Sequence, residues 1–314
     1  MRESRKVVII GAGKVGMTYA YTLLQSGLAR YMVLIDKDEK RLSGEIDDLN
    51  HGKFFVPPVE IKMGDYSDCK DADLVVIGAG ASQKPGETRL DLLKKNSAIC
   101  KDIVGNITKH TQDAVLLVVT NPVDVLTYVA LKESGFDKRQ VIGSGTVLDS
   151  ARFRYLLSDC CGVDPRNVHA YILGEHGDSE IAAWSMVHLS GVPLSEVCKE
   201  CPRRGTCNKK EEIFQQVKNS AYHIIESKGA TYYAVSQAML RITSAILRDE
   251  KSFLTVSSLL EGEYGIEDVC LSLPTITGSG GAERIVAPEL TEEEEKGLKN
   301  SARVLKDSLK QLDL

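Results

Sequence analysis

Short hydrophobic runs recur along the first half of the chain, and polar segments suited to helices separate them. The runs cover residues 6–10, 31–35, 73–78 and 114–120. A short run that is apolar throughout is typical of a strand buried on both faces. Because helical segments alternate with these strands, the first half predicts a doubly wound parallel sheet of the α/β class.

The pattern changes near residues 143–146. Beyond it the sequence predicts a helix over 149–161, a strand over 168–173, helices over 210–228 and 232–248, and strands over 253–260 and 269–278. Helices and strands in this irregular order indicate a mixed α+β domain. We therefore expect an N-terminal domain, 1–143, and a C-terminal domain, 144–314.

An amphipathic helix is expected to close the chain. Thr291 and Glu294 have the spacing of a capping box, and the acidic residues that follow Thr291 complement the helix dipole. Apolar residues then recur at helical spacing, which predicts a helix docked on the core by one face.

A glycine-rich turn, Gly11-Ala12-Gly13-Lys14-Val15-Gly16, follows the first strand and opens a helix. Gly11 permits a tight turn, Gly13 lets the backbone approach a pyrophosphate, and Gly16 brings the helix against the strand. Asp36 ends the second strand, where a carboxylate accepts hydrogen bonds from ribose hydroxyls and repels an added phosphate. The pattern favours NAD over NADP and a Rossmann fold, although a glycine turn of another α/β protein is the alternative.

Composition and charge exclude several classes of function. The 314 residues are 43% hydrophobic and 26% charged, which is typical of a globular protein of about two domains. The net charge is -5 and the chain has no basic block, so neither a nucleic acid nor a membrane partner is expected. No apolar run approaches the length of a membrane span, and residues 1–5 do not resemble a signal peptide. We expect a cytoplasmic protein.

Eight cysteines are spread along the chain, which favours reduced thiols over disulfides in a chain of this size. Cys198, Cys201 and Cys207 lie in one polar loop that begins like a zinc knuckle. Structural zinc takes four protein ligands, and a fourth is not evident nearby. We therefore interpret these as loop cysteines and expect no metal site.

A histidine stands between glycines in Gly174-Glu175-His176-Gly177-Asp178, behind an apolar run suited to a strand. Imidazole acts as acid or base near neutral pH because its ordinary pKa is about 6.5. Flanking glycines let a substrate approach closely. His176 is thus a candidate proton donor, and a solvent-exposed turn histidine is the alternative.

Asp149 and Arg152 are three residues apart, so they occupy neighbouring positions on one helix face. Arg152 could hold a substrate carboxylate through two parallel hydrogen bonds, while Asp149 fixes the tautomer of a histidine. A surface salt bridge is the alternative for an isolated pair.

Two further polar positions follow predicted strands, at the edge where α/β sheets bind ligands. Residues 80–89 form a polar segment that ends in Arg89 and is suited to a lid that excludes water. Asn121-Pro122 follows the next strand, so the Asn121 amide could meet cofactor or substrate while the proline fixes the turn, with a cis bond as one option.

Along nearly its whole length, the chain resembles the L-lactate and malate dehydrogenase family. The motifs that carry the resemblance are Gly11 to Gly16, Asp36, Gly86-Glu87-Thr88-Arg89, Asn121-Pro122, Asp149-Ser150-Ala151-Arg152 and Gly174 to Asp178. The resemblance implies an NAD-binding first domain and a substrate-binding second domain. It also implies that His176 donates the proton, Asp149 is its partner, Arg152 binds the substrate carboxylate and Arg89 polarises the ketone. By the same resemblance, Asn121 lies near the nicotinamide and Thr231 closes the substrate pocket.

Within the family, the lid residue six before the loop arginine distinguishes substrates, and here it is Gln83. Malate dehydrogenases have an arginine there that pairs with the second carboxylate of oxaloacetate, whereas a neutral glutamine suits the methyl group of pyruvate. The resemblance therefore favours reduction of pyruvate to L-lactate. The alternatives are a dehydrogenase for malate or a larger 2-oxo acid, and a non-catalytic NADH sensor, which would not need His176, Asp149, Arg152 and Arg89 together.

Arg152 and Arg154 point about 200° apart on one helix, so they cannot both contact the substrate. Arg154 and His169 match the positions with which allosteric bacterial members of the family hold a phosphate of fructose bisphosphate across a subunit interface. The resemblance thus implies a homotetramer activated by that sugar, and two ordinary surface residues are the alternative.

Overall fold

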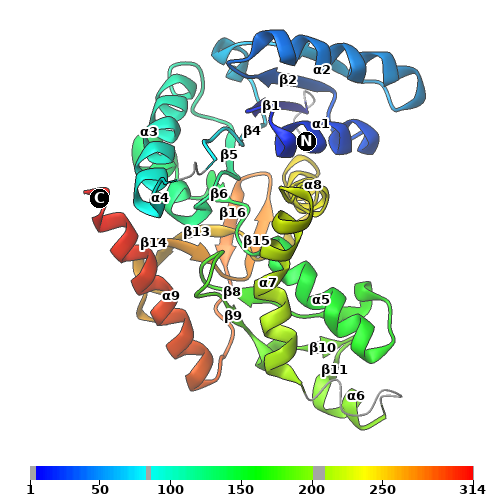
Figure 1. Cartoon of the computed structure of the whole chain (residues 1–314), viewed down its shortest axis with the longest axis vertical. Coiled ribbons are helices and arrows are strands. Elements are labelled where there is room, and N and C mark those ends of the chain that lie inside the picture. Colours follow the sequence, from blue (N-terminus) through cyan, green and yellow to red (C-terminus); the bar gives the residue numbers. More distant parts are fainter. Residues whose placement is uncertain (1–4, 83–85, 201–208, 314) are drawn as a thin grey trace.

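The computed structural model describes residues 5–82, 86–200 and 209–313. A large sheet with helices on both faces dominates it (Figure 1). The strands of this sheet are β1 (Lys6–Ile10), β2 (Tyr31–Ile35), β3 (Glu60–Met63), β4 (Leu74–Ile77), β5 (Val115–Val118), β6 (Val141–Gly143), β13 (Ser257–Glu261) and β14 (Glu267–Ser272). The helices are α1 (Lys14–Ser26), α2 (Glu39–His51), α3 (Arg89–Ile107), α4 (Val123–Ser134), α5 (Val147–Cys161), α6 (Leu194–Glu200), α7 (Lys210–Lys228), α8 (Tyr233–Leu247) and α9 (Glu292–Lys310).

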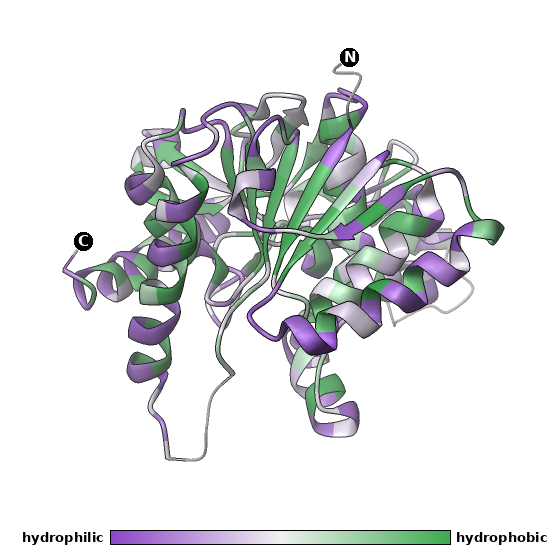
Figure 2. Cartoon of the chain, turned by 90° about the horizontal axis from the view of Figure 1, so that it is seen from above, coloured by the Kyte–Doolittle hydropathy of each residue, from purple (hydrophilic) through white to green (hydrophobic). Residues whose placement is uncertain are grey.

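The strand order is β14-β13-β6-β5-β4-β1-β2-β3, with β1 to β6 parallel. This arrangement confirms the predicted doubly wound sheet. Alternate residues of one strand face opposite sides: Val8 packs with α3, α4 and α9, and Val7 with α1, α2 and α8. The central strands β4 and β5 are hydrophobic and buried along their whole length because both faces of the sheet are covered there (Figure 2).

Two strands from the second half continue the main sheet, which sequence reasoning did not foresee. The strands expected over 253–260 and 269–278 are each divided in two, and β13 and β14 add to β6 as antiparallel strands. Pro274 follows β14 and has no backbone N–H to donate to a ladder, which helps to end the strand there. Short β3 and β6 were also not predicted.

The remaining strands that the structure describes form three small sheets. These strands are β7 (Val168–His169), β8 (Ile172–Leu173), β9 (Ile181–Ala182), β10 (His188–Leu189), β11 (Val192–Pro193), β12 (Ser252–Leu254), β15 (Thr275–Gly278) and β16 (Gly281–Ile285). Strands β7 and β8, in two of the sheets, contact α5, and β15, in the third, contacts α8. The single strand expected over 168–173 is thus two strands, β7 and β8.

The C-terminal helix α9 has the predicted capping box between Thr291 and Glu294. Its apolar face, which includes Leu298 and Leu305, is buried in the same core as α4. No helix in the described ranges is long and apolar enough to cross a membrane.

Candidate functional site

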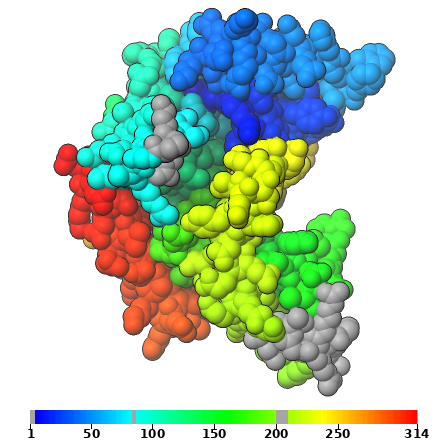
Figure 3. Space-filling view, viewed as in Figure 1, coloured from blue at the N-terminus to red at the C-terminus, as the bar shows by residue number. Residues whose placement is uncertain are grey.

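A cavity of about 330 Å³ lies where the carboxyl ends of β4 and β5 meet the second half of the chain. Figure 3 shows the surface hollowed between the cyan segment that begins α3 and the yellow-green helix α7. Its lining includes Val15, Asn121, Arg152, His176 and Thr231, which are five of the predicted site residues. Residues more than 200 positions apart in the sequence therefore share one cavity.

The turn that carries His176 is fixed on both sides. Gly174 exchanges two backbone hydrogen bonds with Ser272 of β14, at 2.9 and 3.0 Å. Gly174 has a φ of +91°, and a β-carbon there would lie 2.7 Å from the Ser301 hydroxyl of α9. The same hydroxyl accepts a hydrogen bond from the Glu175 N–H at 2.6 Å. A glycine is required at 174 because both the backbone conformation and the close approach exclude a side chain.

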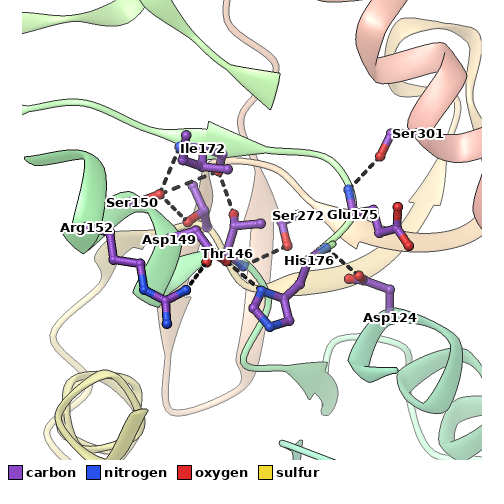
Figure 4. Close-up of polar contacts among 11 residues, drawn as sticks. Asp124, Thr146, Asp149, Ser150, Arg152, Ile172, Glu175, His176, Ser272 and Ser301 are labelled. Carbon is purple, nitrogen blue, oxygen red and sulfur yellow. Dashed lines mark hydrogen bonds and ion pairs between the residues drawn. The ribbon is translucent and has the colours of Figure 1, made fainter. Parts of the chain in front are cut away.

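Helix α5 brings a carboxylate and a guanidinium to this turn (Figure 4). His176 Nδ1 lies 2.6 Å from Asp149 Oδ2, and Arg152 donates from a terminal nitrogen to Asp149 Oδ1 at 2.8 Å. Asp149 is only 3% exposed. The spacing of Asp149 and Arg152 thus places both on the cavity side, as their sequence predicts.

The charges of this group set its protonation. The Asp149 carboxylate raises the pKa of His176 to about 9, although burial of the imidazole acts in the opposite direction. Burial favours the neutral form of Asp149, but the His176 and Arg152 charges outweigh it and lower the pKa of that carboxyl. His176 is therefore protonated at neutral pH. Because Asp149 is bonded to Nδ1, the other ring nitrogen, Nε2, remains available to donate a hydrogen bond to a ligand.

Hydroxyl groups hold α5 against the strand before the turn. Thr146 donates to the Ile172 carbonyl at 2.5 Å, and the Ser150 hydroxyl accepts from the Ile172 N–H at 3.0 Å. Both hydroxyls are buried, so their hydrogen bonds are shielded from water. The register between α5 and β8 that brings Asp149 to His176 is fixed by these contacts (Figure 4).

The glycine turn fits a dinucleotide. A β-carbon at Gly16 would lie 1.9 Å from the Gly11 carbonyl, and one at Gly11 would lie 2.4 Å from the Ala79 amide, so both must be glycines. Gly13, by contrast, faces open space at the start of α1, whose first turn has no acidic residue. A helix N-terminus that is open in this way can bind phosphate through its free N–H groups.

A second cavity, of about 870 Å³, adjoins the first and is lined by Gly11, Gly13 and Asp36. Both cavities are bordered by Gly80 and Ser82. Asp36 Oδ2 accepts a hydrogen bond from the Ala12 N–H at 2.7 Å, which ties the end of β2 to the glycine turn. The predicted cofactor residues other than Gly16 therefore line the two adjoining cavities, from Asp36 to the one that contains His176.

Asn121 lies at the boundary of the first cavity, and the Asn121-Pro122 bond is cis. The buried amide of Asn96 donates to the Asn121 carbonyl at 2.9 Å and accepts from the Ala81 N–H at 2.8 Å. Asn96 thus joins the two loops that follow β4 and β5, a role that sequence reasoning did not foresee.

Gly80 and Ser82, at the start of the predicted lid, line the cavity, but Arg89 at its end does not. Arg89 begins α3 with its side chain 82% exposed, and a terminal nitrogen lies 3.5 Å from Asp178. Gln83 lies outside the described residues, as do Cys201 and Cys207. Among the residues that the structure describes, no cluster could hold a metal ion.

Arg154 and His169 lie on the far side of α5 from Arg152. Arg154 borders a separate cavity of about 430 Å³, donates to the Ala170 carbonyl at 3.0 Å and stacks on Tyr171. His169, on β7, is exposed. The helix geometry that separates the two arginines is therefore as predicted.

Two buried carboxyl groups near His176 were missed by sequence reasoning. Asp124, on α4, accepts a hydrogen bond from the His176 backbone N–H at 2.7 Å. Glu180 is 5% exposed, and burial, helped by the Asp149 charge, raises its pKa to about 8. Neither residue lies in a motif that the sequence analysis singled out.

Two family models together match almost the whole chain. The model of the lactate/malate dehydrogenase NAD binding domain matches residues 5–143, and that of the lactate/malate dehydrogenase alpha/beta C-terminal domain matches residues 146–313. The chain belongs to the lactate/malate dehydrogenase family. It is accordingly an NAD-dependent oxidoreductase.

Relatives within this family are similar over their full length. An L-lactate dehydrogenase of Acetivibrio thermocellus is 56% identical, over 99% of this chain and 98% of its own. L-lactate dehydrogenase 1 of Clostridium acetobutylicum is 52% identical, over 98% and 99%. The crystal structure of a lactate dehydrogenase from a deep-sea metagenome library of the Medee basin superposes with a TM-score of 0.97 at 47% identity, covering 100% of both chains.

The pairing of His176 with Asp149 predicts a shifted titration. In the whole protein we expect the His176 imidazole to titrate near pH 9, because the Asp149 charge raises its pKa to about 9. Asp149→Asn should lower the midpoint by about 1–3 units, since burial then opposes the charged form with less compensation. NMR of histidine-labelled protein measures both midpoints. Asp164→Asn, which removes a carboxylate paired with Arg166 at the surface, is the matched control. An unchanged midpoint in Asp149→Asn would contradict the electrostatic assignment.

Proposed function

We propose that the chain catalyses the reversible, NADH-dependent reduction of pyruvate to L-lactate, with His176 as proton donor. The observation that carries this proposal is the 2.6 Å contact between His176 Nδ1 and the buried Asp149 carboxylate, beside Arg152 in one cavity. The identity to L-lactate dehydrogenases supports the choice of substrate.

Each residue has a distinct task in this proposal. His176 donates its Nε2 proton to the carbonyl oxygen of pyruvate, and Asp149 stabilises the charged imidazole before the transfer. Arg152 holds the carboxylate of the substrate. In the reverse direction, His176 takes the proton from the hydroxyl of L-lactate.

The cofactor is bound along the glycine turn. Gly11, Gly13 and Gly16 admit the pyrophosphate at the start of α1, Asp36 binds the ribose, and Val15 and Asn121 lie toward the nicotinamide. When bound, NADH supplies the hydride that reduces the carbonyl carbon. We assign residues 1–143 to an NAD-binding domain and residues 144–314 to a substrate domain.

Closure of the segment before α3 is part of the proposal. It would bring Arg89 to the carbonyl oxygen, where a guanidinium stabilises the developing charge, and Gln83 to the methyl group of pyruvate. Thr231 closes the opposite side of the pocket. Closure also excludes water, which strengthens every charge interaction in the site.

We further propose that the protein is a cytoplasmic homotetramer activated by fructose bisphosphate through Arg154 and His169. Support comes from α5, which carries Arg152 on one side and Arg154 on the other. A shift of α5 would move both Arg152 and Arg154, and coupling between two sites requires such a shared element.

Replacement of His176 tests the catalytic assignment. His176→Asn should lower the turnover of pyruvate by about 100-fold or more, the scale of a lost general acid, while NADH binding stays nearly intact. Steady-state assay and NADH fluorescence titration measure the two quantities. His51→Asn, at the exposed end of α2, is the matched control. Half of the wild-type turnover in His176→Asn would exclude the histidine from the chemistry.

A substitution in the lid tests the substrate. Gln83→Arg should shift preference from pyruvate toward oxaloacetate by roughly a thousandfold, because it supplies a partner for a second carboxylate that is otherwise buried unpaired. The ratio of kcat/KM for the two substrates is the measurement, and Gln83→Leu, which supplies no charge, should not gain oxaloacetate activity. A constant ratio in Gln83→Arg would show that residue 83 does not face the substrate.

The regulatory part has its own test. Fructose bisphosphate should lower the half-saturating concentration of pyruvate in the wild type, and Arg154→Gln should lose that response because a phosphate ligand is removed. Arg166→Gln, at an exposed arginine paired with Asp164, should keep it. A wild type that does not respond, or an Arg154→Gln variant that responds fully, would refute the regulation and leave the catalytic proposal intact.

A further inference from the structure

Asp124 joins the first half of the chain to the catalytic turn. It lies in the first turn of α4, directly after the cis Asn121-Pro122 bond. Its Oδ2 accepts a hydrogen bond from the His176 backbone N–H at 2.7 Å (Figure 4). The side chain of His176 thus contacts a carboxylate of α5, and its backbone contacts a carboxylate of α4.

The burial of this carboxyl group is costly. Asp124 is 2% exposed, and its Oδ1 has no hydrogen bond of ordinary geometry to the residues that the structure describes. Burial raises the pKa of Asp124 to about 6, and the nearby Ser257 hydroxyl and the His176 N–H offset only part of that effect. A buried acid that is incompletely paired destabilises the fold, so its position calls for a functional explanation.

We propose that Asp124 is a positioning residue for His176: it fixes the backbone of the histidine so that the imidazole stays against Asp149, and adds a second buried negative charge that holds the proton. The proposal rests on the function proposed above. It assigns Asp124 no contact with substrate, and its effect passes through His176 alone.

Two effects follow from this position, and they can be separated. The hydrogen bond acts on geometry, because a turn free to shift by about 1 Å would misalign the proton donor. The charge acts on titration, because the Asp124 carboxylate is among the groups that raise the pKa of His176. Since Asp124 titrates near pH 6, it is ionised where His176 loses its proton.

Other charged groups face the same region and must be kept constant in a test. Around His176 these are Asp149 and Glu180, which also raise its pKa. Around Asp124 they are Glu175 of the catalytic turn and Cys270 of β14, whose own pKa is raised by burial and by the Asp124 charge. Substitutions at 124 leave all four of these residues in place.

Two variants separate the hydrogen bond from the charge. Asp124→Asn keeps an oxygen that can accept from the His176 N–H but removes the charge, so the His176 midpoint should fall by about 0.5–1 unit with kcat at pH 6 within a few-fold of wild type. Asp124→Ala removes both, so kcat should also fall roughly 10- to 100-fold. The His176 midpoint is measured by NMR of histidine-labelled protein, and the alkaline limb of kcat/KM for pyruvate should move with it.

The control is Asp268→Asn, which removes an exposed carboxylate bonded to Tyr128 and Lys132 on the same helix and should leave the midpoint unchanged. NADH affinity and melting temperature monitor the fold. The proposal would be overturned if the His176 midpoint of both Asp124→Asn and Asp124→Ala equalled that of the wild type. It would also be overturned if the loss of kcat in Asp124→Ala followed a loss of NADH affinity alone. Because the NMR midpoint needs no turnover, a failure of pyruvate reduction in the wild type would be recognised separately.

Discussion

The contact between His176 Nδ1 and Asp149 Oδ2 is the interaction on which the rest of the site depends. Burying a protonated imidazole or a carboxylate without a partner costs free energy. The contact between the two groups at 2.6 Å offsets that cost for both. The His176 charge and, to a lesser extent, the Arg152 guanidinium bonded to the second oxygen of Asp149 lower the pKa of this carboxyl and keep it ionised. Loss of His176 would leave Asp149 with Arg152 as its charged partner, and loss of the Asp149 charge would favour the neutral imidazole of His176.

The fold makes this contact possible by joining segments that are distant in sequence. Helix α5 leaves the main sheet just after β6, and β14 returns to the same sheet and holds Gly174 through backbone hydrogen bonds. The turn that carries His176 is therefore anchored to the sheet that also carries the glycine turn. Helix α8 packs on α1 in the same way, with Tyr19 bonded to Thr243 at 2.7 Å. Residues from both halves of the chain thus pack and hydrogen-bond within one framework.

Sequence reasoning predicted what depends on local patterns. The glycine spacing, the apolar strands and the Thr291 cap are local, and the structure has each of them. The three-residue spacing of Asp149 and Arg152 also specified a shared helix face.

What was missed depends on contacts between distant segments. Nothing near Asp124 in the sequence indicates that its partner is the backbone of His176, and nothing near Ser257 indicates that its strand joins β6. Strand pairing of this kind is set by packing of the whole chain, which single-sequence patterns do not record. The buried acids Asp124 and Glu180 were missed for the same reason, since an acidic residue is ordinarily expected at the surface.

The exposed position of Arg89 indicates that the proposed closure of the segment before α3 would cost little free energy. In the structure its side chain is 82% exposed and meets Asp178, itself 68% exposed, at 3.5 Å. Ion pairs this exposed contribute less than about 1 kcal/mol, because water solvates both charges nearly as well as they solvate each other. Inside a closed cavity, the same guanidinium would face a developing oxyanion in a far less polar medium, where its interaction is several times stronger. The weak contact with Asp178 would therefore hold Arg89 only loosely, and in the proposed reaction the developing oxyanion would supply the larger interaction that favours the closed position.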